Sequence, residues 1–163
     1  MNRPNASAVP TPFRVAADGI ALSADGSRVF YSPLSNRHLF SVSADALVDT
    51  EFPDERVAAT VIDHGEKGAS DGLESDAEGR IYVTDYEHGG IRRRSADGSS
   101  YETLVHDPRA LWPDTLSLAA DGYLYFTANQ LHRQPGFHGG RDLRQKPYVL
   151  FRIEIDGTPL QLR

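Results

Sequence analysis

Apolar and polar positions alternate along most of this chain in short runs, and turns made of an acidic residue and glycine separate the runs. One segment occurs three times, at residues 18–26, 71–79 and 114–122, and each copy leads into a strand-like run such as Ile81–Asp85. In each copy an Asp precedes a turn Gly by eight residues, and the copies begin 53 and 43 residues apart. Repeats of this length made of short strands are typical of propeller blades.

The pattern predicts an all-β fold, a β-propeller with antiparallel blades of the four-stranded type. Val, Ile, Tyr, Phe and Thr, which suit a pleated surface, dominate the runs. The third blade lacks an evident fourth strand, and residues 43–48 are the only candidate helical turn. We expect an irregular segment at 1–12 and blades at 13–65, 66–108 and 109–163. The predicted strands span 19–23, 28–32, 38–43, 58–63, 72–75, 80–85, 90–94, 101–105, 115–118, 123–128 and 148–154.

Three blades cannot surround an axis, because propellers close with four to eight. Two expectations follow. The chain is a piece of a longer propeller, which is the interpretation we favour, or two copies pair about a two-fold axis to complete six blades. The partner is then the missing half of the ring or a second copy of the chain, which meets the apolar flanks that a half ring exposes.

Composition narrows the classes of partner. The chain has 17 basic and 23 acidic residues and a net charge of −6, which disfavours a nucleic acid. No apolar run approaches the roughly 20 residues that span a bilayer. There are no cysteines, and residues 1–12 contain no apolar core of a secretory signal, so the sequence leaves the compartment open.

Several stretches resemble the yellow/major royal jelly protein family, in its bacterial branch. They are Asp18-Gly-Ile-Ala-Leu-Ser23, Tyr31-Ser-Pro-Leu-Ser35 with His38-Leu-Phe-Ser41, and Trp112-Pro-Asp-Thr-Leu-Ser117 with Tyr125-Phe-Thr-Ala-Asn-Gln-Leu-His-Arg133. The resemblance implies a six-bladed propeller, of which this chain is the C-terminal three blades. It also implies a secreted or periplasmic protein that binds small molecules.

More distantly, Ser70-Asp-Gly-Leu73 with Asp76-Ala-Glu-Gly-Arg-Ile-Tyr-Val83 is similar to the gluconolactonase and senescence-marker-protein group. In that group the Asp that Asp71 matches ligates a divalent cation and is the base in lactone hydrolysis. Asp18 matches a position where the group has an Asn ligand. The group's other ligands, a Glu and an Asn, lie in blades that this chain does not contain.

The repeat itself predicts a site. The first strand of a blade lines the central channel, so Asp18, Asp71 and Asp114, at the start of the three first strands, are expected near one mouth. Clustered carboxylates raise one another's pKa unless a cation compensates, and Ca²⁺ or Mg²⁺ is the natural cation for oxygen ligands. With the resemblance to the gluconolactonase group, this expectation assigns metal binding to Asp71 and Asp18. The alternative is that each Asp only orders its own turn.

Loops on the same face add polar groups. Tyr86 follows the second strand of blade two, and Asn129, Gln130 and His132 open a long loop, residues 129–147, in blade three. The loop contains four basic residues and one acidic residue, Asp142. Because long loops in compact repeats are usually functional or disordered, it is either a lid over the mouth or a solvated connection. Trp112 is expected to fill the gap between blades, or to form an aromatic wall for a ligand.

Three hypotheses for function follow. The first is a binder of small molecules at the channel mouth, through Asp18, Asp114, Tyr86, Asn129, Gln130 and His132 together with Asp71. The second is a metal-dependent lactone hydrolase with Asp71 as catalytic base. The third is an interaction module that completes its ring by dimerisation.

Overall fold

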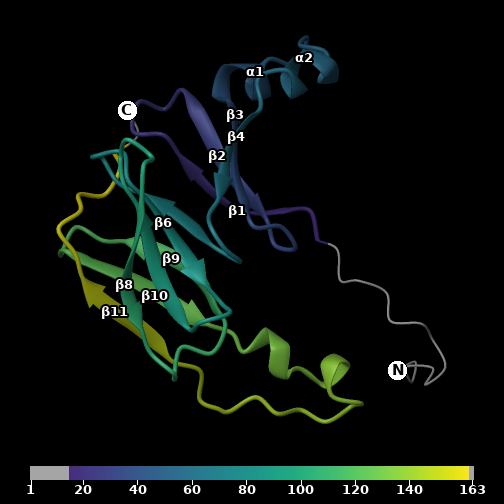
Figure 1. The fold of residues 1–163 in the computed structure, drawn as a ribbon, viewed down its shortest axis with the longest axis vertical. Coiled ribbons are helices and arrows are strands. Elements are labelled where there is room, and N and C mark those ends of the chain that lie inside the picture. The colour runs from purple at the N-terminus through teal and green to yellow at the C-terminus, as the bar shows by residue number, and fades with distance from the viewer. Residues whose placement is uncertain (1–14, 162–163) are drawn as a thin grey trace.

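The structure, a computed structural model, describes residues 15–161, which form three antiparallel sheets in chain order (Figure 1). Each sheet is a meander in which consecutive strands are neighbours. Sheet one contains β1 (Ala17–Leu22), β2 (Arg28–Pro33), β3 (His38–Ser43) and β4 (Ile62–Glu66). Sheet two contains β5 (Leu73–Ser75), β6 (Ile81–Asp85), β7 (Gly90–Arg94) and β8 (Tyr101–His106). Sheet three contains β9 (Pro113–Leu118), β10 (Tyr123–Ala128) and β11 (Leu150–Glu154).

The all-β prediction and the blades are therefore confirmed, and within residues 15–161 the third blade has three strands, as expected. The turn glycines of the repeat explain why the same segment recurs. Gly26, Gly79 and Gly122 have φ angles of 72°, 84° and 83°, a left-handed conformation that other residues adopt at a cost. The prediction for residues 1–12 lies outside the described residues.

The core lies between the sheets, and the alternation along β6 shows how it forms. Ile81 and Val83 pack towards sheet one, whereas Tyr82 packs towards sheet three, because successive strand side chains point to opposite faces. All three are almost fully buried, so β6 is covered on both sides. The first cluster also contains Ala21, Phe30, Leu39 and Leu73, and the second Ile91, Ala110, Leu116, Leu118, Leu124 and Phe126.

The first strands of the three sheets lie side by side, β1 against β5 and β5 against β9. Two glycines of the repeat permit this approach. A Cβ on Gly19 would stand 2.5 Å from the carbonyl oxygen of Asp71, and one on Gly72 would overlap the carbonyl oxygen of Asp114. Each glycine thus packs against the Asp of the next blade, which brings the starts of the first strands together.

Sheet one differs from the prediction after β3. Helix α1 (Ala44–Val48) matches the expected helical turn, but α2 (Asp54–Ala58) was not expected, and β4 begins at Ile62 rather than at residue 58. Pro53 precedes α2 and two acidic residues occupy its first turn, which favours a helix start. None of the helices in the described residues is long and apolar enough to cross a membrane.

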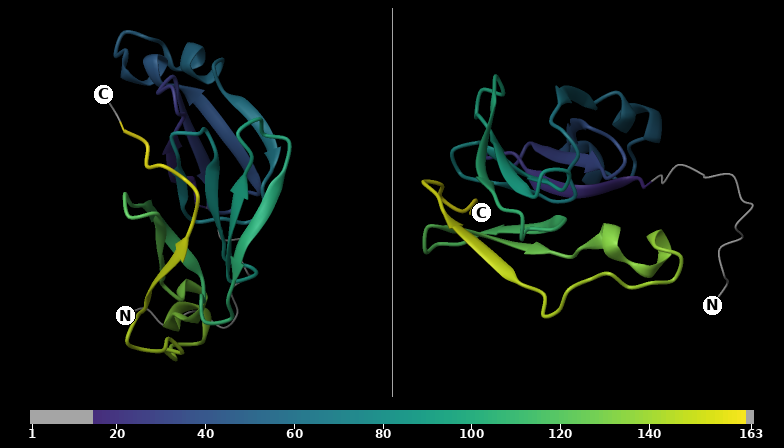
Figure 2. Two further views of the ribbon diagram at one scale, coloured as in Figure 1. Left: turned by 90° about the vertical axis from the view of Figure 1, so that its left-hand side faces the viewer. Right: turned by 60° about the horizontal axis from the view of Figure 1, so that its bottom comes forward.

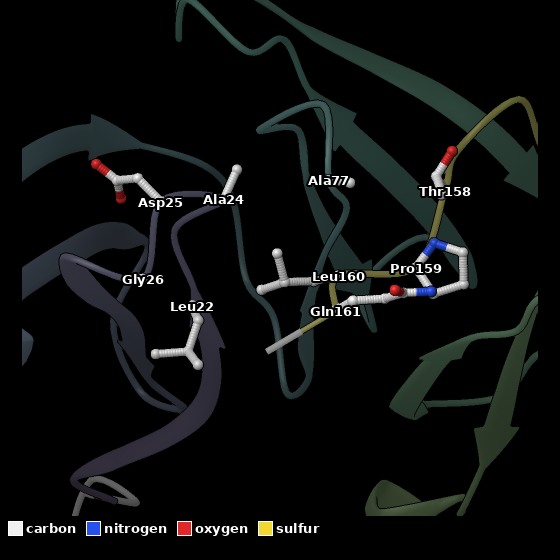
Figure 3. A pocket seen from close by; sticks show the side chains of 9 residues that line it. All are labelled: Leu22, Ala24, Asp25, Gly26, Ala77, Thr158, Pro159, Leu160 and Gln161. Carbon is white, nitrogen blue, oxygen red and sulfur yellow. The ribbon is translucent and has the colours of Figure 1, made fainter. Parts of the chain in front are cut away.

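After β11 the chain returns to sheet two (Figure 2). Pro159 forms an antiparallel bridge with Asp76, and the amide of Ala77 donates to the carbonyl of Thr158 at 2.9 Å. We call residues 156–161 the C-terminal strap. Between the strap and the β1–β2 turn lies an open cavity of about 890 Å³, into which Leu160 projects (Figure 3).

Candidate functional site at the channel mouth

Three carboxylates meet where the first strands begin. Asp18 lies in β1, Asp71 just before β5 and Asp114 in β9, and all three line one cavity of about 320 Å³. The rest of its lining comes from the same three strands, since residues 19, 20, 72–74, 115 and 116 complete it. The structure therefore brings together the three Asp residues that the repeat singles out, and we call this place the mouth.

Asp71 is the most sheltered of the three, with 6% of its surface exposed. The backbone amides of Asp71 and Gly72 both donate hydrogen bonds to the hydroxyl of Thr84, which fixes the backbone here. Burial above all, together with the nearby carboxylates of Asp114 and Asp18, raises the pKa of Asp71 to about 6. A hydrogen bond of 2.7 Å from Trp112 Nε1 to Asp71 Oδ2 acts in the opposite direction.

Asn129 fixes Asp114. Its Nδ2 donates to Asp114 Oδ2 at 2.7 Å, its backbone amide donates to the carbonyl of Trp112, and its Oδ1 accepts from the amide of Leu131. Because Asn129 follows β10 and Asp114 lies in β9, this side chain ties the two strands together beside the mouth.

An aromatic stack borders the mouth. The ring of Tyr86 lies parallel to that of Trp112, with centroids 4.1 Å apart, and the His132 ring is also stacked on Trp112, with centroids 5.8 Å apart. Tyr86 also donates its hydroxyl proton to the carbonyl of Leu34, in the loop between β2 and β3. Trp112 has a φ of 63°, which is rare for a large side chain and is typical of functional sites.

The three rings of the stack also line a second cavity, of about 580 Å³, between the loops of sheets two and three. His132 lines this cavity, and its Nδ1 is buried without a hydrogen-bond partner among the described residues. Burial lowers the pKa of His132, so the ring favours its neutral form. A buried unpaired nitrogen is uncommon and marks a place where a ligand or water can bind.

Gln130 lies in the same loop but does not line the mouth cavity. Its side chain donates to the carbonyl of Gln145 and accepts from the amide of Gln145, so it closes the long loop on itself. Two short 3-10 helices, η1 (Leu131–Arg133) and η2 (Pro135–Phe137), shape the loop. Its one ion pair within residues 15–161 joins Arg144 to Asp142, and a lid function remains a prediction.

The arrangement of the carboxylates at the mouth shows whether the described residues could hold a divalent cation. Asp71 accepts a hydrogen bond from Trp112 on Oδ2, and Asp114 accepts one on each carboxylate oxygen, from Asn129 on Oδ2 and from Thr115 Oγ1 on Oδ1. Among residues 15–161 no three His, Cys, Asp or Glu side chains are arranged to hold a metal ion. Ca²⁺ needs six to eight oxygen ligands. The described residues therefore do not form a complete metal site, and ligation by Asp71 and Asp18 stays a prediction.

Trp112 is the site residue that sequence reasoning undervalued. The sequence assigned it mainly to packing between blades, yet it holds the Asp71 carboxylate and carries the aromatic stack. Its position two residues before Asp114 was the available signal, because the start of that first strand was already expected at the mouth.

Comparisons with known proteins agree with this architecture. The model of the major royal jelly protein family matches residues 12–149. Among curated proteins, none matches the sequence.

Three solved structures illustrate the fold. A gluconolactonase from Xanthomonas campestris is 21% identical, with a TM-score of 0.62 over 90% of this chain and 46% of that one. Regucalcin from Agrobacterium tumefaciens, a calcium-binding protein, is 20% identical, with a TM-score of 0.59 over 90% and 50%. A virginiamycin B lyase from Staphylococcus aureus is 16% identical, with a TM-score of 0.51 over 88% and 40%. The chain thus spans about half the length of these propellers, and the likeness shows the fold alone.

Proposed function

Since the chain belongs to the major royal jelly protein family, we propose that its three blades are part of a propeller that binds a small molecule at the mouth. The observation that carries the proposal is the convergence of Asp18, Asp71 and Asp114 on one cavity beside an aromatic stack. Pockets with a few fixed polar groups among aromatic side chains are typical of ligand sites.

The mouth also defines the charge of its ligand. Its four ionisable groups, Asp18, Asp71, Glu74 and Asp114, are all acidic, and no ion pair within residues 15–161 joins an Arg or Lys to any of them. A ligand that brings hydrogen-bond donors or a positive charge relieves the repulsion among the carboxylates. Around the carboxylates, Asn129 holds Asp114, and Tyr86 and His132 stack on Trp112. We propose that the ligand also contacts Tyr86, Asn129, Gln130 and His132 directly.

The test uses Trp112, the one tryptophan of the chain. Its indole N–H is bonded to Asp71, so a ligand in the mouth changes its fluorescence. We expect organic cations to change the Trp112 emission in a titration that saturates. Neutral analogues of the same shape should bind more weakly. Asp71→Asn should weaken the response and Asp45→Asn, on the exposed surface of α1, should not. Equal binding by the two variants contradicts the proposal.

A second candidate is a lactone hydrolase, favoured by the raised pKa of Asp71 and by the fold shared with a gluconolactonase. A carboxylate whose pKa is about 6 accepts a proton more readily than an ordinary Asp and can activate water as a general base. Turnover of a panel of lactones, lost in Asp71→Asn and kept in Asp45→Asn, supports this candidate. Absence of turnover by the whole protein rejects it.

A complete ring is the third part of the proposal. Apolar side chains are exposed on the two outer sheets, among them Ile20 in β1 and Leu150 in β11, which are 65% and 64% exposed. We propose that another half of the propeller, or a second copy of this chain, covers them. Sedimentation at several concentrations tests the second copy, because a strict monomer excludes it. Location outside the cytoplasm, which the family resemblance implies, is tested by fractionating cells.

A further inference from the structure

A second cleft lies between sheets one and two, away from the mouth. Its cavity of about 360 Å³ is bounded by the β2–β3 loop, the segment from β4 to β5 and the β6–β7 loop. Lys67 lies in its wall and has only 1% of its surface exposed, an unusual burial for a lysine. None of the residues that line the mouth cavity lines this one.

The backbone around Lys67 is firmly held. Its amide donates to the carbonyl of Arg37 at 2.7 Å, and its own carbonyl accepts from Arg92 Nη1 at 2.7 Å. The ammonium group donates one hydrogen bond, to the carbonyl of Gly68 at 2.9 Å. An ammonium has three N–H donors, so two remain for another partner.

The charges around the cleft leave this ammonium without a counter-ion. Glu87 forms an ion pair with Arg37, and the carboxylate of Asp85 is hydrogen-bonded to His88 Nδ1. Within residues 15–161 no carboxylate forms an ion pair with Lys67 or Arg92. A buried charge is costly unless it is paired, so the cleft favours a negatively charged occupant.

The protonation of Lys67 agrees with this picture. Burial above all, together with the cations Arg37 and Arg92, lowers the pKa of the Lys67 ammonium to about 8, and the carboxylate of Asp85 acts in the opposite direction. The cleft also contains Glu66, Glu87 and His88. A bound anion restores the charged form, because an opposite charge nearby favours it.

We propose that this cleft binds a small oxyanion, with the Lys67 ammonium and the Arg92 guanidinium as its donors. The cavity of about 360 Å³ has room for an anion of a few heavy atoms. Lysine and arginine together are a common pair for carboxylate and phosphate oxygens.

The chain has two lysines, Lys67 and Lys146, which gives a matched control. Calorimetric titrations with sodium phosphate and with sodium acetate separate the two sources of the anion, at constant ionic strength. We expect one of the two anions to bind the wild type and Lys146→Met with equal affinity. Its affinity for Lys67→Met should be about tenfold lower, or lower still. No binding of either anion, or equal binding by Lys67→Met, overturns the proposal.

Should Lys67→Met fail to fold, the wild type still decides the matter. Titration with the bound anion near pH 8, in buffers of different ionisation enthalpy, measures the protons that binding takes up. If phosphate is the anion that binds, sulfate replaces it in this experiment, because sulfate does not change its own protonation near pH 8. We expect net uptake, retained in His88→Gln, because Arg and carboxyl groups do not change charge in this range. Binding without proton uptake overturns the proposal.

Discussion

The Nε1 atom of Trp112 donates a hydrogen bond of 2.7 Å to Oδ2 of Asp71, across the boundary between sheets two and three. The two residues are 41 positions apart in the chain, and one comes from the linker before β9 and the other from the linker before β5. Because Trp112 is the one tryptophan, its emission reports on a single carboxyl group.

The first prediction concerns the pH dependence of the Trp112 emission. Burial and the neighbouring carboxylates raise the pKa of Asp71 to about 6, so its protonation should change the Trp112 emission with a midpoint near that pH. The measurement is a fluorescence titration from acid to neutral pH. Asp71→Asn should abolish the transition and Asp45→Asn should leave it in place. A flat profile in the wild type contradicts the assignment.

The second prediction concerns stability. The pKa of Asp71 is higher in the folded state than the ordinary value of 3.8, so the folded protein holds this proton more tightly. The stability from this group is therefore present at low pH and is lost as pH rises through about 6. At neutral pH, Asp71→Asn should raise the free energy of unfolding by about 2–3 kcal/mol.

Urea unfolding at acid and neutral pH measures this effect as the difference between wild type and variant. The difference should shrink towards zero at pH values below the unfolded pKa, where the wild-type carboxyl is protonated in both states. A variant that is less stable than the wild type at neutral pH shows instead that the Trp112 hydrogen bond to a charged carboxylate dominates.

The third prediction concerns the glycine of the repeat. A Cβ on Gly72 would overlap the backbone carbonyl of Asp114, so Gly72→Ala must push β5 and β9 apart. We expect a loss of roughly 1–3 kcal/mol in unfolding free energy, with a disturbed Trp112 environment. Gly136→Ala is the control, because nothing lies within 4 Å of its Cβ position. Equal stability of the two variants contradicts the close packing of the first strands.

Much of this architecture was predictable because each repeat carries its own signals. The turn glycines, the alternation along β6 and the Asp at each start are local features, and the blade geometry follows from their spacing. The three carboxylates could be placed together for the same reason. The glycine after Asp18 and Asp71 was visible too, but its packing role needs the neighbouring blade.

The remainder depends on contacts between residues distant in sequence. The sequence alone does not show that Trp112 reaches Asp71, because that hydrogen bond exists only once sheets two and three are packed. Lys67 carries no motif, and its burial follows from how Arg37 and Arg92 hold its backbone. The error at β4 is different, since alternation over 58–63 was taken for a strand while Pro53 and the acidic residues after it start a helix.

The fourth prediction concerns the C-terminal strap, which depends on one buried carboxylate. Asp76 is fully buried and accepts hydrogen bonds from the Arg80 amide, from Arg80 Nε at 2.6 Å and from the Tyr82 hydroxyl at 2.8 Å. Arg80 in turn reaches the side chain and carbonyl of Asp156 in the strap. Asp76→Asn leaves this guanidinium without its buried partner, which should cost roughly 3 kcal/mol of unfolding free energy.

Hydrogen exchange separates the local from the global effect. The amide of Ala77 donates to Thr158 in the strap, so it should exchange faster in Asp76→Asn, beyond what the loss of global stability explains. Asp156→Asn is the matched comparison, because Asp156 is largely exposed on the strap side of the same network. That variant should free the Ala77 amide while costing about 1 kcal/mol or less of unfolding free energy. Protection of Ala77 that is unchanged in both variants would show that the strap is held by its backbone bridge to Asp76, without help from Arg80.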